Sequence, residues 1–262
     1  MIARHLALGG PAPHFHDMSE KTPAKPTTLP TETQRSDPNA VASFLKQARA
    51  LGAGRVAGAS KGRLILALDA TMSRQPTWDL ACALQAEMFD AVGKTGRLEV
   101  QLVYFRGFGE CRSSKFVSDT GKLKDLMVKI DCRGGHTQIG KVLSHALTET
   151  EAQKVNALVY IGDAMEEEVD DLAEKAGRLG LKGVPVFLFQ EGHDPSAERA
   201  FKEIARLTRG AWFRFDRNAA STLAELLSAI AIYATGGYPA LEARGRGADR
   251  LLIENMRGRS GS

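Results

Sequence analysis

The chain has 262 residues, of which 43% are hydrophobic and 25% are charged, the ordinary composition of a globular protein. No apolar stretch approaches the roughly 20 residues that a membrane helix needs, and the N-terminus lacks a convincing secretory pattern, so we expect no membrane association. The net charge of +4 comes from the two ends of the chain. Residues 1–63 carry nine Lys or Arg against four Asp or Glu, residues 241–262 carry five against three, and the remainder carries twenty-one against twenty-four. The expected folded part therefore gives nucleic-acid binding no support.

The three cysteines are Cys82, Cys111 and Cys132. They form no C-x-x-C pair, and an odd number cannot all pair within one chain. This pattern is typical of a reduced protein, so we expect a cytoplasmic location without a disulfide framework.

The first 61 residues divide into an expected tail and an expected helix. Residues 1–37 are rich in Pro, Thr, Ser, Gly and His and show no periodic apolar pattern, which predicts disorder. Met18 resembles a natural chain start, so residues 1–17 are interpreted as an upstream extension. Asp37 and Pro38 form a helix opening, and apolar residues follow at helical spacing, so residues 38–61 are predicted to be a flanking helix and a linker.

Residues 62–235 alternate between strand-like and helix-like segments. This pattern predicts a doubly wound, mostly parallel α/β sheet of six strands, with helices on both faces in a Rossmann-like arrangement. The short turn at 107–109 predicts an antiparallel hairpin at one edge of the sheet. The expected strands are 64–68, 98–105, 112–117, 155–161, 184–189 and 211–215, and the expected helices are 76–92, 120–129, 138–150, 167–179, 196–208 and 219–233.

The C-terminal residues 236–262 are expected to be a linker followed by a short segment. Residues 236–249 are rich in Gly and Arg, which favours a solvated linker. The apolar residues of 251–256 favour one short docking helix.

Five polar side chains follow the expected strands and loops at one edge of this sheet. Asp69, Thr71 and Ser73 come directly after the strand 64–68, Thr137 precedes a helix, and Asp163 comes after the strand 155–161. Open α/β sheets bind their ligands at the carboxyl ends of the strands. Residues two apart in an extended segment point the same way, so the first three side chains can face one point.

All of the donor atoms in this set are oxygens, and hard oxygen donors favour Mg²⁺, Mn²⁺ or Ca²⁺. Three of the donors are neutral hydroxyls and only two are carboxylates. A cation held in this way keeps much of its positive charge and attracts a carboxylate from another molecule. The site is therefore expected to bind an acidic group rather than to break a bond.

The pattern Asp69-x-Thr71-x-Ser73, followed by Thr137 and Asp163, resembles the metal-ion-dependent adhesion site of the von Willebrand factor A (VWA) family. The resemblance covers about residues 62–235 and includes the edge hairpin. It implies that the three hydroxyls bind the ion and that the two Asp residues form its acidic pair, directly or through water.

The sequence departs from the family pattern at three places. Thr71 replaces a Ser, His136 precedes the loop Thr, and a Gly-Asp-Ala turn around Asp163 replaces a common Asp-Gly. His136, Glu166 and Glu167 are expected to contact a partner. Two alternatives remain. His136 can be a solvated loop residue, and the acids at 166–168, 170 and 171 can open the next helix and favour its dipole.

The resulting expectation is a divalent-metal-dependent adaptor with Mg²⁺, Mn²⁺ or Ca²⁺ at its site and no catalytic activity. It captures an Asp or Glu side chain of a partner protein. Intracellular relatives in the resembled family imply a place in an assembly driven by an AAA+ ATPase. The alternatives are a metal-dependent phosphoryl hydrolase and a metal-free scaffold that acts through its flanks.

Overall fold

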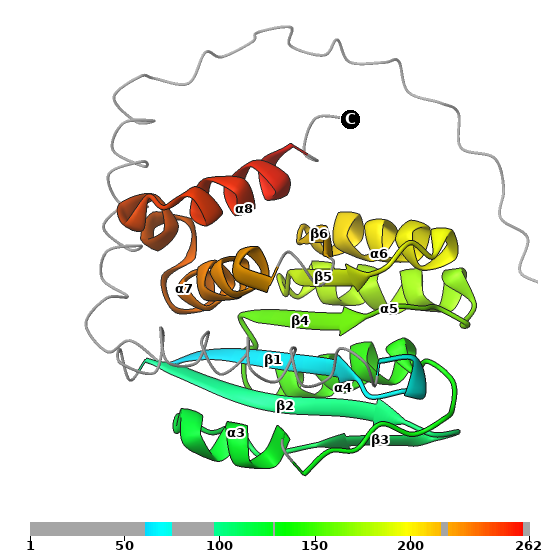
Figure 1. Cartoon of the computed structure of the whole chain (residues 1–262). Helices are drawn as coiled ribbons and strands as arrows, with labels where there is room; N and C mark the ends of the chain where they lie inside the picture. The colour runs from blue at the N-terminus through cyan, green and yellow to red at the C-terminus, as the bar shows by residue number, and fades with distance from the viewer. Residues whose placement is uncertain (1–60, 75–96, 128, 216–219, 259–262) are drawn as a thin grey trace, which may run out of the picture. The chain divides into compact units, whose positions relative to one another are not determined.

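The structure is a computed structural model that describes residues 61–74, 97–127, 129–215 and 220–258, all of which belong to one compact unit, residues 58–262. Six strands form one sheet in the order β3-β2-β1-β4-β5-β6 (Figure 1). Neighbouring strands are parallel except β2 and β3. The strands are β1 (Gly62–Asp69), β2 (Leu98–Arg106), β3 (Glu110–Ser113), β4 (Ala157–Gly162), β5 (Val186–Glu191) and β6 (Ala211–Phe215).

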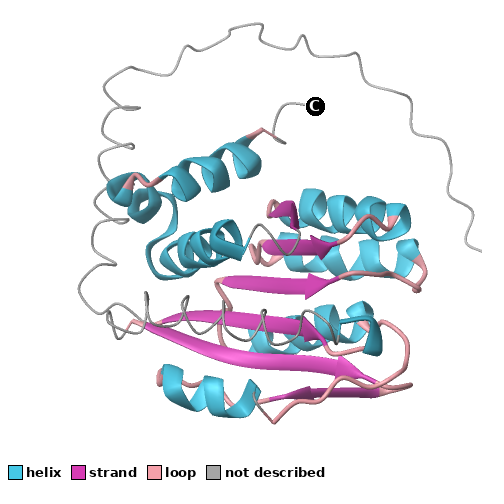
Figure 2. Ribbon diagram, in the orientation of Figure 1, coloured by secondary structure: helices cyan, strands magenta, loops and turns pink. Residues whose placement is uncertain are grey.

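Helices cover both faces of the sheet, as Figure 2 shows, so the predicted doubly wound α/β fold is confirmed. The helices are α3 (Thr120–Met127), α4 (Ile139–Ala152), α5 (Val169–Leu181), α6 (Pro195–Thr208), α7 (Ala220–Arg244) and α8 (Gly247–Arg257), with a 3₁₀ turn, η2, at Met72–Arg74. The expected tail (1–37), the flanking helix and linker (38–61) except Lys61, and the helix 76–92 lie outside the described residues.

Strand β1 is buried at every position because it lies between two hydrophobic cores. Leu64, Leu66 and Leu68 pack into the core shared with α3, α7 and α8. Ile65 and Ala67 pack into the core shared with α4, α5 and α6. A strand covered on both faces needs apolar side chains at odd and even positions alike, which is why this segment is a continuous apolar run.

The predicted edge hairpin is confirmed, with a shift in its second strand. Strands β2 and β3 pair with Arg106 opposite Glu110. Strand β3 therefore begins two residues before the expected 112, and it ends at Ser113. Gly107 has φ 61°, the left-handed conformation that the tight turn needs and that glycine adopts without strain. A single antiparallel bridge between Val100 and Val117 continues the pairing further along.

The expected linker at 236–249 is wrong, because these residues are mostly helical. Helix α7 runs to Arg244 with a kink at Gly237, whose φ is 64°, and α8 begins at Gly247. The arginine that suggested solvent exposure is paired instead: Arg244 donates to the carboxylate of Asp249 and to Ser228 Oγ. The expected docking helix is confirmed as α8, which buries four apolar side chains, Ala248, Leu252, Ile253 and Met256, in the core.

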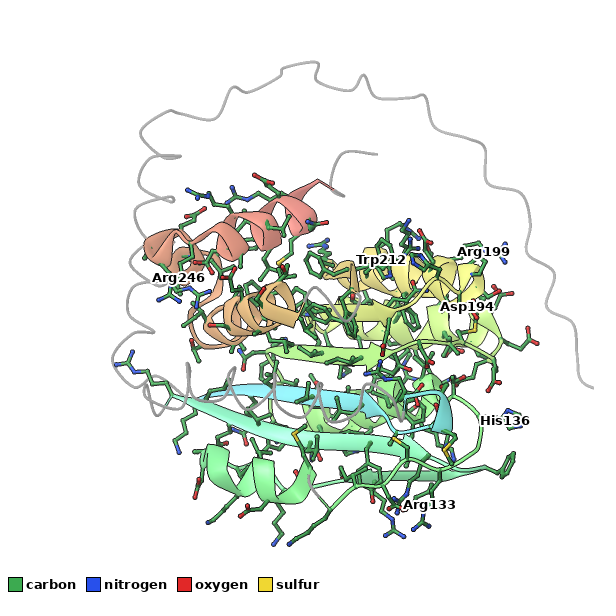
Figure 3. All side chains as sticks on the ribbon, in the orientation of Figure 1. Arg133, His136, Asp194, Arg199, Trp212 and Arg246 are labelled. Atoms are coloured by element: carbon green, nitrogen blue, oxygen red, sulfur yellow. The ribbon has the colours of Figure 1, made fainter. Side chains whose placement is uncertain are left out.

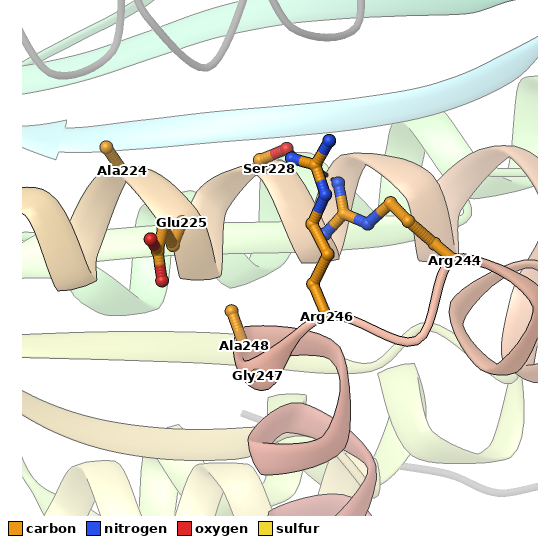
Figure 4. Close-up of a pocket in the computed structure, with 7 residues that line it drawn as sticks. All are labelled: Ala224, Glu225, Ser228, Arg244, Arg246, Gly247 and Ala248. Atoms are coloured by element: carbon orange, nitrogen blue, oxygen red, sulfur yellow. Dashed lines mark hydrogen bonds between the residues drawn. The ribbon is translucent and has the colours of Figure 1, made fainter.

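A pocket of about 430 Å³ lies between α7 and α8 (Figure 4). Glu225, Ser228, Arg244 and Arg246 are among its lining residues, and none of the residues that line it belongs to the predicted metal site. Figure 3 shows Arg246 at the opposite end of the sheet from His136 and Asp194. In the described part of the chain, no helix combines the length and apolar character that a membrane span requires.

Candidate metal site at the carboxyl ends of the strands

The two predicted carboxylate ligands leave neighbouring strands at the same edge of the sheet. Asp69 is the last residue of β1, and Asp163 directly follows β4. These strands are parallel, with Leu68 opposite Ile161, so Asp163 lies about one residue beyond the level of Asp69. Adjacent strands are about 4.8 Å apart. The topology therefore brings the two acids to one place, as the sequence predicted.

The loop after β1 brings together the first three predicted ligands. Asp69 Oδ1 accepts a hydrogen bond from the backbone N–H of Thr71 at 2.8 Å. The hydroxyl oxygens of Thr71 and Ser73 are 3.0 Å apart, and Arg74 N donates to Thr71 O at 3.0 Å to close the turn. Adjacent oxygens around an octahedral Mg²⁺ at about 2.0–2.1 Å are about 2.9–3.0 Å apart, so the hydroxyl pair matches one edge of that geometry.

The carboxylates of Asp69 and Asp163 each keep one buried oxygen that accepts no hydrogen bond from protein: Oδ2 of Asp69 and Oδ1 of Asp163. Leaving a buried polar atom unpaired costs roughly 1–3 kcal/mol, more when it is charged. Burial raises the pKa of Asp69 to about 6; hydrogen bonds from Thr71 oppose the increase, and the nearby Asp163 adds to it. Two unsatisfied oxygens on neighbouring carboxylates fit a site for a cation.

Thr137 is held beside the Asp163 loop by a reciprocal pair of hydrogen bonds. Its Oγ1 accepts from Glu166 N at 3.0 Å, and its backbone N donates to Glu166 Oε2 at 3.1 Å. The loop that carries Thr137 is also fixed to the β1 loop, because Arg133 N donates to Ala70 O at 3.0 Å. The three predicted loops are therefore connected by backbone contacts, and one lone pair of the Thr137 hydroxyl is already engaged.

The hairpin turn supports the Thr137 loop from the other side. A Cβ atom at Gly135 would lie 2.0 Å from Gly107 O, so only glycine permits this approach of the two backbones. His136 N donates to Gly107 O at 3.2 Å. The side-chain amide of Gln138 donates to the carbonyl oxygens of Arg106, Gly107 and Glu110 at 3.2–3.4 Å.

Helix α5 begins at Val169 with Glu168 at its N-cap position and Asp170 and Asp171 in its first turn, so the alternative is confirmed for these acids, whereas Glu166 and Glu167 precede the helix. Glu167 instead accepts hydrogen bonds from the first backbone N–H groups of α4, those of Ile139 at 2.5 Å and Gly140 at 2.8 Å. Glu166 accepts from Thr137 N, and His136 Nδ1 lies 3.0 Å from the same carboxylate oxygen. Glu167 is therefore a cap that positions the Thr137 loop.

Two of the residues near the site face solvent. His136 is exposed, and its ring meets the ring of Phe108 edge to face at 5.2 Å between centroids. Phe108, at the tip of the hairpin turn, is 84% exposed. An exposed aromatic residue next to a candidate site is a feature of interaction surfaces, because a free surface gains nothing from it.

Sequence reasoning missed Arg74, the residue directly after Ser73. Its side chain is 1% exposed, and it forms an ion pair with Glu191, the last residue of β5. Its guanidinium also lies 5.9 Å from the ring centre of Phe215. Burial lowers the pKa of Arg74, while the carboxylates of Asp163 and Asp69 act in the opposite direction. A lone basic residue in a turn normally indicates exposure, so the sequence held no signal for this burial.

Among the described residues, no group of three or more His, Cys, Asp or Glu side chains is arranged to hold a metal ion. The predicted ligand set contains only two residues of these types, Asp69 and Asp163. A cation at this edge of the sheet would therefore depend on the hydroxyls of Thr71, Ser73 and Thr137.

No family model matches the chain, and no curated protein matches it. Solved structures do resemble it. The VWA domain of SpRpn10 aligns with a TM-score of 0.53 and 12% identity, covering 63% of this chain and 94% of that one. An aerotolerance-related membrane protein from Bacteroides fragilis gives 0.50 and 16%, covering 75% and 98%. The human COPII-coat protein Sec24c gives 0.52 and 12%, covering 64% of this chain and 32% of that one.

The first of these structures is a VWA domain that is covered almost from end to end. Together with the six-stranded sheet and its antiparallel edge, this likeness shows that the chain has the VWA fold. At identities of 12–16% the likeness extends to the fold alone.

Proposed function

We propose that this chain is a protein-binding module that takes a divalent cation, Mg²⁺ or alternatively Mn²⁺ or Ca²⁺, at the edge of its sheet. Asp69, Thr71, Ser73, Thr137 and Asp163 would hold the ion. The observation that carries the proposal is the pair of buried, unpartnered carboxylate oxygens on Asp69 and Asp163. The bound ion would supply residual positive charge at an open position, where a partner's Asp or Glu side chain binds.

The residues around the ion define what the partner meets. Phe108 and His136 provide an exposed aromatic pair on one side. The carboxylate of Glu166 adjoins this pair, with its Oε2 3.0 Å from His136 Nδ1. A partner segment that combines an acidic residue for the ion with an apolar residue for Phe108 fits this surface. His136 and Glu166 would contact the same partner.

An adaptor role agrees with the occurrence of the same fold in a coat protein. A place in an AAA+ ATPase assembly, a cytoplasmic location and the absence of catalysis are parts of this proposal that rest on the sequence resemblance. Nothing in the described site favours the phosphoryl hydrolase over the binding module, because Thr71 occupies the position where such enzymes need a second acid.

The metal part of the proposal is tested by isothermal calorimetry with Mg²⁺ and Mn²⁺. The wild type is expected to bind one ion, and Asp69→Ala and the double variant Ser73→Ala/Thr137→Ala are expected to bind none. Asp194→Ala is a matched control, since Asp194 lies at the same edge of the sheet but caps α6 through Ser196 N and Ala197 N. This control should lose about 1 kcal/mol of stability and keep the ion. Equal, absent binding in wild type and Asp69→Ala contradicts the proposal.

The partner part is tested with a displayed library of random peptides, selected on wild-type protein in Mg²⁺ and eluted with chelator. Peptides enriched in Asp or Glu that release on chelation are expected. Selection on Ser73→Ala/Thr137→Ala should return none of them. Enrichment that persists in this variant favours the metal-free scaffold, and turnover of a generic phosphate ester by the Mg²⁺-loaded protein favours the hydrolase.

A further inference from the structure

The side chain of Arg74 crosses the carboxyl edge of the sheet. It starts from the turn after β1 and ends in an ion pair with Glu191, the last residue of β5. In the sheet, β4 lies between these two strands, and Asp163 follows β4. A side chain that joins the end of β1 to the end of β5 must therefore pass the end of β4.

Arg74 is packed in this position rather than resting on the surface. It is 1% exposed, its backbone N is bonded to Thr71 O, and its guanidinium lies 5.9 Å from the ring of Phe215 at the end of β6. A buried guanidinium needs at least one acidic partner, because an isolated buried charge is very unfavourable. The neighbouring acids are those of Glu191, Asp163 and Asp69.

The charges in this cluster do not balance. Among the described residues, the guanidinium of Arg74 pairs with Glu191 and lies within electrostatic range of two further carboxylates, Asp163 and Asp69. The guanidinium offsets part of the repulsion among them, which would otherwise favour protonation or separation of the acids. The remaining negative charge leaves room for a further cation, and any cation that enters is repelled by the guanidinium already present.

We propose that Arg74 is the resident cation of this site: it keeps the candidate ligands in place without a metal ion and lowers the affinity of the site for a divalent cation. This inference rests on the proposed function. It makes Arg74 a positioning residue that sets how much divalent ion the site needs. Because a partner's carboxylate adds negative charge, the ion and an acidic partner bind cooperatively at such a site.

The test compares Mg²⁺ affinity, measured by calorimetry, and the melting temperature in chelator and in saturating Mg²⁺. Arg74→Gln removes the charge and keeps a hydrogen-bond donor for Glu191, and Arg74→Met removes both. Each variant is expected to bind Mg²⁺ at least about tenfold more tightly than wild type. Each should also melt lower than wild type in chelator and recover more on addition of Mg²⁺, since a ligand that binds only the folded state stabilises it.

Two further variants separate charge from packing. Arg74→Lys keeps the positive charge and is expected to bind Mg²⁺ within about threefold of wild type. Glu191→Gln removes one negative charge and loosens the anchor of the guanidinium, so its affinity should fall below that of wild type by about tenfold. Because Glu191→Gln leaves Arg74 in place, it gives a result even if Arg74→Met does not fold.

The outcomes distinguish the role of Arg74 from the proposed metal-binding function. Tighter binding in Arg74→Gln with near-wild-type binding in Arg74→Lys supports the inference. If wild type binds Mg²⁺ and Arg74→Gln binds it no more tightly, the inference is overturned and the proposed function stands. If neither wild type nor Arg74→Gln binds an ion, both are overturned.

Discussion

Two buried arginines mark the two ends of β1, and their surroundings differ. Arg63, near the start of the strand, donates to Gln153 O at 2.6 Å and to Glu149 Oε2 at 3.2 Å, with its guanidinium 3.7 Å from the centre of the Phe116 ring. Arg74, after the end of the strand, pairs with Glu191 and lies near the carboxylates of Asp163 and Asp69, the acids that surround it in the described part of the chain. One arginine has a single acidic partner and joins α4 to the sheet, whereas the other is outnumbered by acids.

The difference separates a guanidinium paired with one acid from a guanidinium near several acids. The charge of Arg63 is balanced by one acid, so it leaves no excess charge for a ligand, although its buried Nε donates no hydrogen bond. A guanidinium with three acids leaves negative charge and unpaired oxygens on Asp69 and Asp163. Excess charge in a buried cluster costs stability, and this cost is the physical basis of the binding role proposed for that end of β1.

The largest expected effect is a loss of stability when Arg63, at the start of β1, is replaced. Arg63→Met removes the partner of Glu149 and of the Gln153 carbonyl at a position that is almost fully buried. The free energy of unfolding should fall by about 3 kcal/mol, as for other broken buried pairs. Urea denaturation monitored by circular dichroism measures this loss, and Mg²⁺ at saturation should not restore it.

The matched control for this prediction is Lys61→Met, which breaks an exposed pair with Glu99 at 3.5 Å. Exposed pairs contribute about 0–1 kcal/mol, so this variant should unfold close to wild type. A loss below about 1 kcal/mol in Arg63→Met, or a loss that Mg²⁺ recovers, would remove the distinction between the two ends of β1.

A second prediction concerns the pH dependence that Asp69 creates at the unbalanced end. Its pKa is about 6 in the folded state against an ordinary 3.8, so between these pH values the folded protein holds a proton that the unfolded chain has released. Stability therefore falls as pH rises from about 4 to about 6, by about 3 kcal/mol from this residue, and is level above. Asp69→Asn, which does not titrate, should lack this decline.

The measurement is the unfolding free energy of both proteins in chelator, from pH 4 to pH 8. The difference between Asp69→Asn and wild type should grow in favour of Asn up to about pH 6 and then remain constant. Saturating Mg²⁺ should shrink the difference above pH 6, because the ion binds only the ionised carboxylate. Parallel profiles in chelator would contradict the burial of an unpaired Asp69 charge.

Much of the fold was predictable because it depends on local signals. The apolar runs before Asp69 and Asp163 give buried parallel strands, and the glycines at 107 and 109 give the edge hairpin. A buried strand in an α/β sheet directs the residues after it to the ligand-binding edge. The positions of the two acids therefore follow from strand order alone: Asp69 ends β1, and Asp163 directly follows β4.

The features that the sequence did not predict depend on contacts between distant segments. Arg74 is buried because Glu191, 117 positions away, ends a strand two places along the sheet. Glu167 caps α4 rather than its own helix, and Arg244 pairs with Asp249 where composition favoured a linker. A charged residue is expected at the surface unless its partner is known, and no local pattern names the partner.

The smallest expected effect concerns Glu167, which links the site to α4. Its carboxylate accepts from Ile139 N and Gly140 N, so it both pairs two helix-terminal donors and places negative charge at the positive end of the helix dipole. Glu167→Gln keeps one acceptor and loses the charge, so the unfolding free energy should fall by about 1 kcal/mol. Glu168→Gln is the control, because Glu168 is exposed and makes no capping hydrogen bond, and it should stay within about 0.5 kcal/mol of wild type.

If the cap positions Thr137 two residues before Ile139, Glu167→Gln should also weaken Mg²⁺ binding several-fold while Glu168→Gln does not. A loss of stability with unchanged Mg²⁺ affinity would show that Thr137 is positioned by its bonds with Glu166 alone.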